Sequence, residues 1–195
     1  MGIFSNLFSK KLDPVDFGIL KTDVHSHLIP GIDDGSQSLE ETMAILHKFQ
    51  ELGYKKVITT PHIMSDYFNN NKEIIYGGLE KVKEAISKDP NLNIEIEAAA
   101  EYYTDTSFQE LIDKKDLLTF GKNYVLFELS FQYEPANVKE VIFELTSAGY
   151  QPILAHVERY PYYINQWKKI EDFINRGVKL QLNLNALTGG YGKDI

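Results

Sequence analysis

Short apolar runs with strand character alternate with amphipathic helical segments along most of the chain. Strands joined by helical crossovers pair in parallel, because each helix returns the chain to the same end of the sheet. The alternation therefore predicts an α/β fold with a parallel sheet. Polar residues that end the runs would gather at one rim, which favours a (β/α) barrel with its site there. After a short first strand near Thr22, the runs are residues 56–60, 93–100, 124–130, 152–156 and 178–184.

The helical segments between these runs carry recognisable start and stop signals. Ser38 followed by Glu41 is the pattern of a capping box, and Gly53 is a typical residue for a helix C-terminus. Gly77 and Gly78 predict an interruption of the second helix, because glycine is a poor helix former. The expected helices are residues 38–53, 72–88, 105–114, 135–149 and 167–175.

The segment 23–35, with the sequence DVHSHLIPGIDDG, contains the first candidate metal ligands. His25 and His27 are two residues apart, which on a strand directs both imidazoles to one face. Asp34 follows in a glycine-containing turn, where irregular backbone commonly builds sites. Imidazole with nearby carboxylate indicates a divalent transition metal. Two histidines that happen to share a polar turn are the alternative.

Two carboxylates are embedded in apolar sequence, where an unpaired charge is costly. Glu101 follows three alanines, and Glu128 lies within the strand-like run 124–130. His62 and His156 each end a further run of this kind. We therefore expect these side chains to meet metal ions at the same rim.

The candidate ligands are too numerous for one ion, so two or three divalent metals are expected. Metal pairs of this kind clamp the attacking and leaving oxygens of phosphoryl transfer. Arg159 is a candidate for bidentate contact with phosphate, with a surface salt bridge as the alternative. The seven candidate ligands are His25, His27, Asp34, His62, Glu101, Glu128 and His156.

The composition excludes several classes of function. The net charge of −8 and pI near 5.1 argue against a broad nucleic-acid or anionic-membrane surface, and against polymerase-associated nuclease activity. The absence of cysteine removes thiolate zinc sites and cysteine nucleophiles. No apolar run reaches the roughly 18 residues of a membrane span. We expect a cytoplasmic protein with a mobile leader at residues 1–17 and one domain at residues 18–195.

Five motifs resemble the polymerase-and-histidinol-phosphatase (PHP) superfamily, and specifically the bacterial manganese-dependent protein-tyrosine phosphatases of capsule and exopolysaccharide loci. The motifs lie in family order over residues 23–160, and the first and last are fairly specific to this branch. They are D-V-H-S-H-L-I-P-G-I-D-D-G, T-T-P-H, A-A-E-Y-Y-T, F-E-L-S and A-H-V-E-R-Y.

The resemblance implies a distorted seven-stranded barrel that binds three divalent ions. The expected metal is Mn²⁺, and Fe or Zn are the alternatives. It assigns His25, His27 and Glu101 to the first ion, and Asp34 with His62 to the third. It assigns Glu101, Glu128 and His156 to the second ion. Arg159 would hold phosphate oxygens. The implied substrate is phosphotyrosine on the tail of a cognate bacterial tyrosine kinase.

The sequence departs from the family pattern after the sixth strand. The family continues to an S-D-x-H motif that supplies an aspartate and a histidine, whereas no histidine follows His156 before Ile195. We therefore expect roughly the last barrel unit to be absent. Two other functions remain open: a PHP phosphoesterase acting on a small molecule such as histidinol phosphate, and a non-catalytic metal-binding remnant. Neither the cognate kinase nor the oligomeric state follows from the sequence.

Overall fold

The computed structural model describes residues 17–187 of the 195-residue chain. Apart from Phe17, the leader expected at residues 1–17 lies outside the described residues, as does the end of the expected domain, residues 188–195. The helices are α1 Leu39–Glu51, α2 Lys72–Lys88, α3 Thr106–Lys114, α4 Val138–Ser147, α5 Trp167–Asn175 and α6 Leu184–Leu187. Short 3₁₀ turns are η1 Phe17–Ile19, η2 Val157–Arg159 and η3 Pro161–Tyr163.

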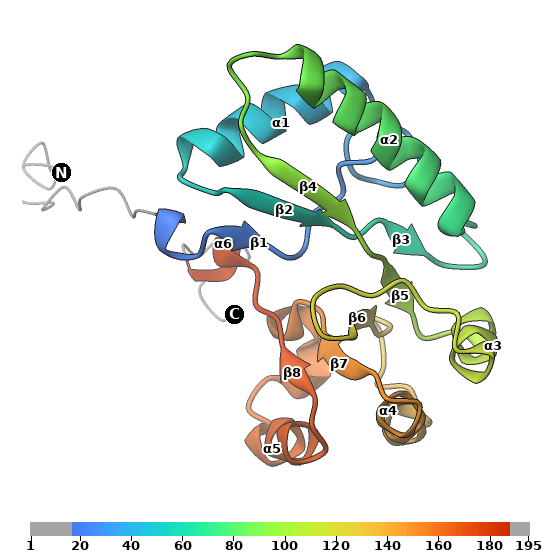
Figure 1. Ribbon diagram of the computed structural model, residues 1–195. Coiled ribbons are helices and arrows are strands. Elements are labelled where there is room, and N and C mark those ends of the chain that lie inside the picture. Colours follow the sequence, from blue (N-terminus) through green and yellow to red (C-terminus); the bar gives the residue numbers. More distant parts are fainter. Residues whose placement is uncertain (1–16, 188–195) are drawn as a thin grey trace, which may run out of the picture.

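The strands form two sheets in which every ladder is parallel. The strands are β1 Thr22–Asp23, β2 Lys56–Thr59, β3 His62–Ile63, β4 Glu95–Ala98, β5 Glu101–Tyr103, β6 Tyr124–Glu128, β7 Gln151–Leu154 and β8 Lys179–Leu180. The order is β1-β2-β4 in one sheet and β3-β5-β6-β7-β8 in the other. Figure 1 shows α1 and α2 over the first sheet, with α3, α4 and α5 around the second. The parallel α/β prediction is confirmed.

Two of the predicted strands are each followed by a short second strand that belongs to the other sheet. β2 gives way to β3 at Pro61, which has no N–H to donate to a ladder. The backbones stay together through the break, because the Ala99 N–H donates to the Thr59 carbonyl at 2.9 Å and the Glu101 N–H to the Pro61 carbonyl at 3.1 Å. The placement of His62 and Glu101 after strand ends was therefore wrong: each begins a short second strand.

The C-terminal end of the described chain also differs from the prediction. The strand expected over residues 178–184 ends at Leu180, and α6 occupies its last position. The cause lies at Asn183, whose carbonyl accepts a hydrogen bond from the Ala186 N–H and starts a helical turn. Among the described residues no ladder joins β8 to β1, so the two sheets are not closed into a barrel by strand pairing there.

The second helix, α2, is continuous through its two glycines, contrary to the predicted interruption. Gly78 is required by packing, because a Cβ there would lie 2.1 Å from Cγ2 of the fully buried Ile29. α2 buries Leu79 and Val82 in the same core, where each contributes about 1.5–3 kcal/mol of apolar burial. This packing holds the loop that carries the first candidate ligands against the helix.

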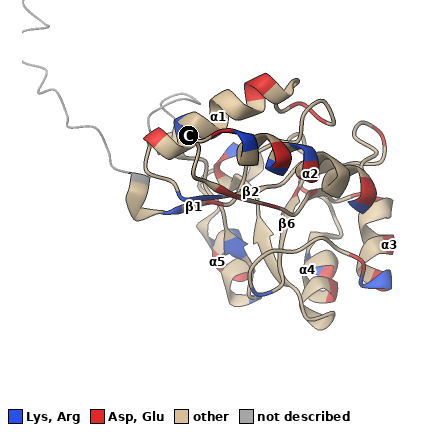
Figure 2. Ribbon diagram, turned by 45° about the horizontal axis from the view of Figure 1, so that its top comes forward, with Lys and Arg blue, Asp and Glu red and all other residues tan. Residues whose placement is uncertain are grey.

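Charged residues of both signs are interspersed over the helices in the view of Figure 2. Many of them pair within a helix, as Lys88 does with Glu84 in α2. None of the helices in the described part of the chain has the length and hydropathy needed to cross a membrane.

Candidate metal centre

The residues singled out from the sequence line one cavity of about 540 Å³. They come from both sheets: His25 and His27 follow β1, whereas Glu128 ends β6 and His156 follows β7. The carboxyl ends of parallel strands share one edge, which explains why residues more than 100 positions apart meet there. The cavity lining includes His25, His27, Asp34, His62, Glu101, Glu128, His156 and Arg159.

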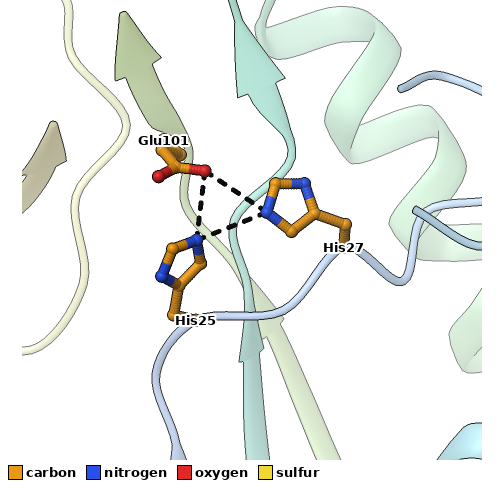
Figure 3. A group of neighbouring side chains, drawn as sticks. All are labelled: His25, His27 and Glu101. Carbon is orange, nitrogen blue, oxygen red and sulfur yellow. Dashed lines mark hydrogen bonds and ion pairs between the residues drawn. The ribbon is translucent and has the colours of Figure 1, made fainter. Parts of the chain in front are cut away.

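His25, His27 and Glu101 form one compact group in the cavity (Figure 3). Nε2 of His25 lies 3.0 Å from Glu101 Oε2 and 3.3 Å from Nε2 of His27. Nε2 of His27 lies 3.3 Å from the same carboxylate oxygen. Burial alone would raise the pKa of Glu101, but hydrogen bonds from His156, His25 and His27 hold it well below its usual value. Glu101 is therefore an ionised carboxylate at the centre of the cluster.

Asp33, which the sequence analysis passed over in favour of Asp34, fixes the orientation of His27. Its Oδ2 accepts hydrogen bonds from His27 Nδ1 at 2.7 Å and from the His62 N–H at 3.0 Å. Its Oδ1 accepts from the Gly35 N–H at 3.0 Å, and the side chain is fully buried. Because His27 Nδ1 donates to Asp33, its Nε2 is the nitrogen that faces Glu101. The two adjacent aspartates indicated a polar site in this turn, but the sequence could not show which of them is buried.

The charges around His27 shift its pKa strongly. Burial lowers the pKa of this imidazole, but hydrogen bonds to Asp33 and Glu101 outweigh burial and raise it to about 10. Burial raises the pKa of Asp33, and its bonds to His27 more than reverse this, so that the pKa is lowered. In the metal-free protein the pair is therefore an imidazolium and a carboxylate.

Asp34, His62 and Glu128 lie on the other side of Glu101. Asp34 Oδ1 is 3.5 Å from His62 Nε2 and, being 68% exposed in its side chain, faces the cavity mouth. His62 Nδ1 is 3.0 Å from Glu128 Oε1. Asp34 and His62 can form a metal group with His27, and His62 can form another with Glu101 and Glu128. His62 therefore stands between two possible metal positions.

His156 approaches the same carboxylates from the end of β7. Its Nε2 lies 2.9 Å from Glu101 Oε1 and 3.6 Å from Glu128 Oε2. Its φ of +29° is unusual for a residue with a side chain, and such backbone strain is common at functional sites. His156 is only 2% exposed, and both carboxylates beside it are also buried. These three residues form the buried floor of the cavity.

Gln181, also passed over in the sequence, lies behind this floor. Its Oε1 is 2.9 Å from His25 Nδ1 and 2.7 Å from the backbone nitrogen of His156. A glutamine just past a short strand gave no sequence signal, because the contact depends on a chain separation of 156 residues.

Aromatic side chains and one cation form the outer wall of the cavity. Arg159 lies with its guanidinium carbon 4.5 Å from the centre of the Phe131 ring. This contact is a cation–π interaction, and it directs the guanidinium along the wall. The other aromatic residues of the lining are Tyr67, Phe68 and Tyr103. The wall thus combines flat aromatic surface with the positive charge of one guanidinium.

The donor set fits divalent metal ions. Three ligand atoms 3.0–3.3 Å apart match the roughly 3.4 Å separation of tetrahedral ligands about 2.1 Å from an ion. A divalent ion bound between these atoms would take the place of the protons through which the imidazoles hydrogen-bond to Glu101. Mixed imidazole and carboxylate ligands suit manganese, iron or zinc. Three such groups of ligand atoms occur in the described part of the chain.

Comparison with known families and proteins gives one consistent result. The family described as "Capsular polysaccharide synthesis, CpsB/CapC" matches residues 21–195. The chain is 28% identical over 162 residues to tyrosine-protein phosphatase CpsB of Streptococcus agalactiae, covering 83% of this chain and 66% of the relative. It is 24% identical over 178 residues to tyrosine-protein phosphatase YwqE of Bacillus subtilis, covering 89% and 68%.

A solved structure supports the same fold. It belongs to the crystal structures of YwqE from Bacillus subtilis and CpsB from Streptococcus pneumoniae, described as unique metal-dependent tyrosine phosphatases. It aligns with a TM-score of 0.80 at 22% identity, covering 88% of this chain and 70% of that chain. The chain spans 66% of the length of the streptococcal relatives.

Proposed function

The chain belongs to the CpsB/CapC family of capsular polysaccharide synthesis, and on this premise we propose that it is a metal-dependent protein-tyrosine phosphatase. The observation that carries the proposal is the single cavity in which four histidines and three carboxylates meet an arginine and an aromatic wall. The names of the relatives support the same reaction.

We propose three metal positions that share the central carboxylate. His25, His27 and Glu101 would hold the first ion, and Glu101, Glu128 and His156 the second. Asp34 and His62 would hold the third, for which the proximity of His27 offers a further nitrogen. Mn²⁺ is the proposed native ion, with Fe and Zn as alternatives that suit the same ligands.

The chemistry follows from the chain's own groups around these ions. When bound, the ions would supply positive charge to the phosphate and activate water for its hydrolysis. Arg159 would bind two phosphate oxygens through its planar fork. The rings of Tyr67, Phe68 and Phe131 would pack against the aryl group of the substrate. Hydrogen bonds from His156, His25 and His27 would keep the Glu101 carboxylate ionised.

The proposed substrate is phosphotyrosine on the tail of a cognate bacterial tyrosine kinase that regulates capsule or exopolysaccharide synthesis. An extended tail suits a cavity that is open at the mouth, where Asp34 and Arg159 are exposed. The proposed location is the cytoplasm. We propose further that residues 18–195 form one PHP-type domain whose strands follow the barrel plan of the family.

A substrate comparison tests the proposal. Purified protein with Mn²⁺ is given a phosphotyrosine peptide, a phosphoserine peptide of the same sequence, and histidinol phosphate. We expect the phosphotyrosine peptide to be hydrolysed fastest. EDTA should abolish the activity, whereas iodoacetamide should leave it unchanged, because the chain has no cysteine. Preference for histidinol phosphate, or no turnover of any substrate by the metal-loaded protein, would contradict it.

A further inference from the structure

Gln181 is placed where the end of the second sheet meets the beginning of the first. Its backbone continues the pairing beyond β8, since its N–H donates to the Leu154 carbonyl at 2.9 Å and its carbonyl accepts from the Val157 N–H at 3.1 Å. Its side chain crosses to the segment that follows β1 and reaches His25. Gln181 therefore links candidate ligands that belong to different sheets.

The hydrogen bonds of Gln181 determine which nitrogen of His25 carries a proton. The backbone N–H of His156 can only donate, so the Gln181 atom 2.7 Å away is the amide oxygen. The same oxygen lies 2.9 Å from His25 Nδ1 and can only accept, so this nitrogen carries the hydrogen. The Gln181 amide nitrogen donates in turn to Asn183 Oδ1 at 2.9 Å, which fixes the amide in this orientation.

The consequence for His25 is that Nε2 is the nitrogen left to bind a metal ion, once the ion has displaced any proton there. That nitrogen is the one 3.0 Å from Glu101 and 3.3 Å from His27. Asp33 imposes the same arrangement on His27 from the opposite side. The Gln181 amide and the Asp33 carboxylate thus orient the two imidazoles so that their Nε2 atoms lie beside each other.

We propose that Gln181 is a positioning residue of the metal centre: it fixes His25 with its hydrogen on Nδ1 and ties it to the backbone of His156. Gln181 thereby orients one ligand of the first proposed ion and the backbone that carries a ligand of the second. Outer groups of this kind set the tautomer and direction of ligating imidazoles. The inference rests on the metal centre of the proposed function.

Three substitutions test it in the full chain. Gln181→Leu removes the acceptor and Gln181→Asn withdraws it by one methylene, whereas Gln181→Glu keeps an acceptor oxygen. Gln151→Leu is the matched control, because Gln151 donates to the Lys122 carbonyl at the start of β7, away from the site. Zn²⁺ affinity is measured by calorimetry. The His25 Nδ1–H signal is measured by nitrogen–proton NMR of the Zn²⁺-loaded protein.

We expect Gln181→Leu and Gln181→Asn to lower Zn²⁺ affinity by about 10- to 100-fold and to lose the protected Nδ1–H signal. Gln181→Glu should retain the signal and most of the affinity, and the control should match wild type. Unchanged affinity and signal in the asparagine variant would overturn the role of Gln181, as would a glutamate variant as weak as leucine. Failure of the wild-type protein to bind Zn²⁺ would instead refute the metal centre itself.

Discussion

Replacing Tyr160 with phenylalanine should destabilise the protein, because it removes the hydrogen-bond acceptor of one buried backbone N–H. The Tyr160 hydroxyl accepts a hydrogen bond from the Leu129 N–H at 3.0 Å, and both residues are fully buried. Phenylalanine fills the same space but leaves this N–H without an acceptor. An unsatisfied buried donor costs about 1–3 kcal/mol of unfolding free energy. Because Leu129 directly follows Glu128, the loss would also loosen a proposed metal ligand.

Tyr162→Phe is the matched control, since it removes a hydroxyl that donates rather than accepts. The Tyr162 hydroxyl donates to the Ser130 carbonyl at 2.6 Å from a half-buried position. Its loss should cost about 0.5–1.5 kcal/mol, the net value of an ordinary hydrogen bond. Urea unfolding of the metal-free proteins measures both, and about 2–4 °C of Tm should accompany each kcal/mol in a chain of this size. A larger loss in Tyr162→Phe than in Tyr160→Phe would refute the reasoning.

Arg159→Lys should lower turnover of an aryl phosphate while metal content stays unchanged, because lysine keeps the charge and loses the planar fork; equal loss of both would mean that Arg159 is structural. Glu101→Gln should abolish tight metal binding in calorimetry, since this carboxylate contacts three imidazole Nε2 atoms. Gly78→Ala should destabilise the fold by about 1–3 kcal/mol, because the added methyl group would overpack against Ile29. Gly77→Ala should stabilise the fold by about 0.5–1 kcal/mol, because a Cβ at Gly77 would face open space. Similar urea midpoints for the two variants would contradict the packing argument. Metal-free protein should lose stability between pH 6.5 and about 10, because folding raises the pKa of His27 to about 10. This stabilisation is complete below the pKa of the unfolded state and is lost as the pH rises through the pKa of the folded state. A His27→Gln variant should show a smaller slope in pH-dependent urea unfolding, with the remainder due to the raised pKa of His62.

The sequence was sufficient for the parallel α/β fold and for the convergence of the candidate histidines and glutamates in one cavity. Both follow from local periodicity and from the rule that parallel strands share an edge. The short second strands that begin at His62 and Glu101 were missed, because an apolar run does not reveal where a ladder changes sheets. The strand predicted through Leu184 failed because a local carbonyl starts a helix there.

The groups behind the ligands were harder to predict than the candidate ligands themselves. Asp33 and Asp34 are adjacent and chemically identical, and only the fold shows that Asp33 is buried against His27 while Asp34 faces the cavity mouth. Gln181 depends on a contact across 156 positions of the chain. The roles of the candidate ligands and of Arg159 stay predictions until metal binding is measured.

The division of the strands between two sheets bears on how the chain comes apart. The three-stranded sheet presents His25 and His27, and the five-stranded sheet presents Glu101 and Glu128. An ion held from both sides would be a further cross-link between the two sheets, besides their common core and the hydrogen bonds that Gln181 and Asp33 make between them. The metal-loaded protein should therefore unfold in one cooperative step, and hydrogen exchange of the metal-free protein should reveal the smaller sheet opening first.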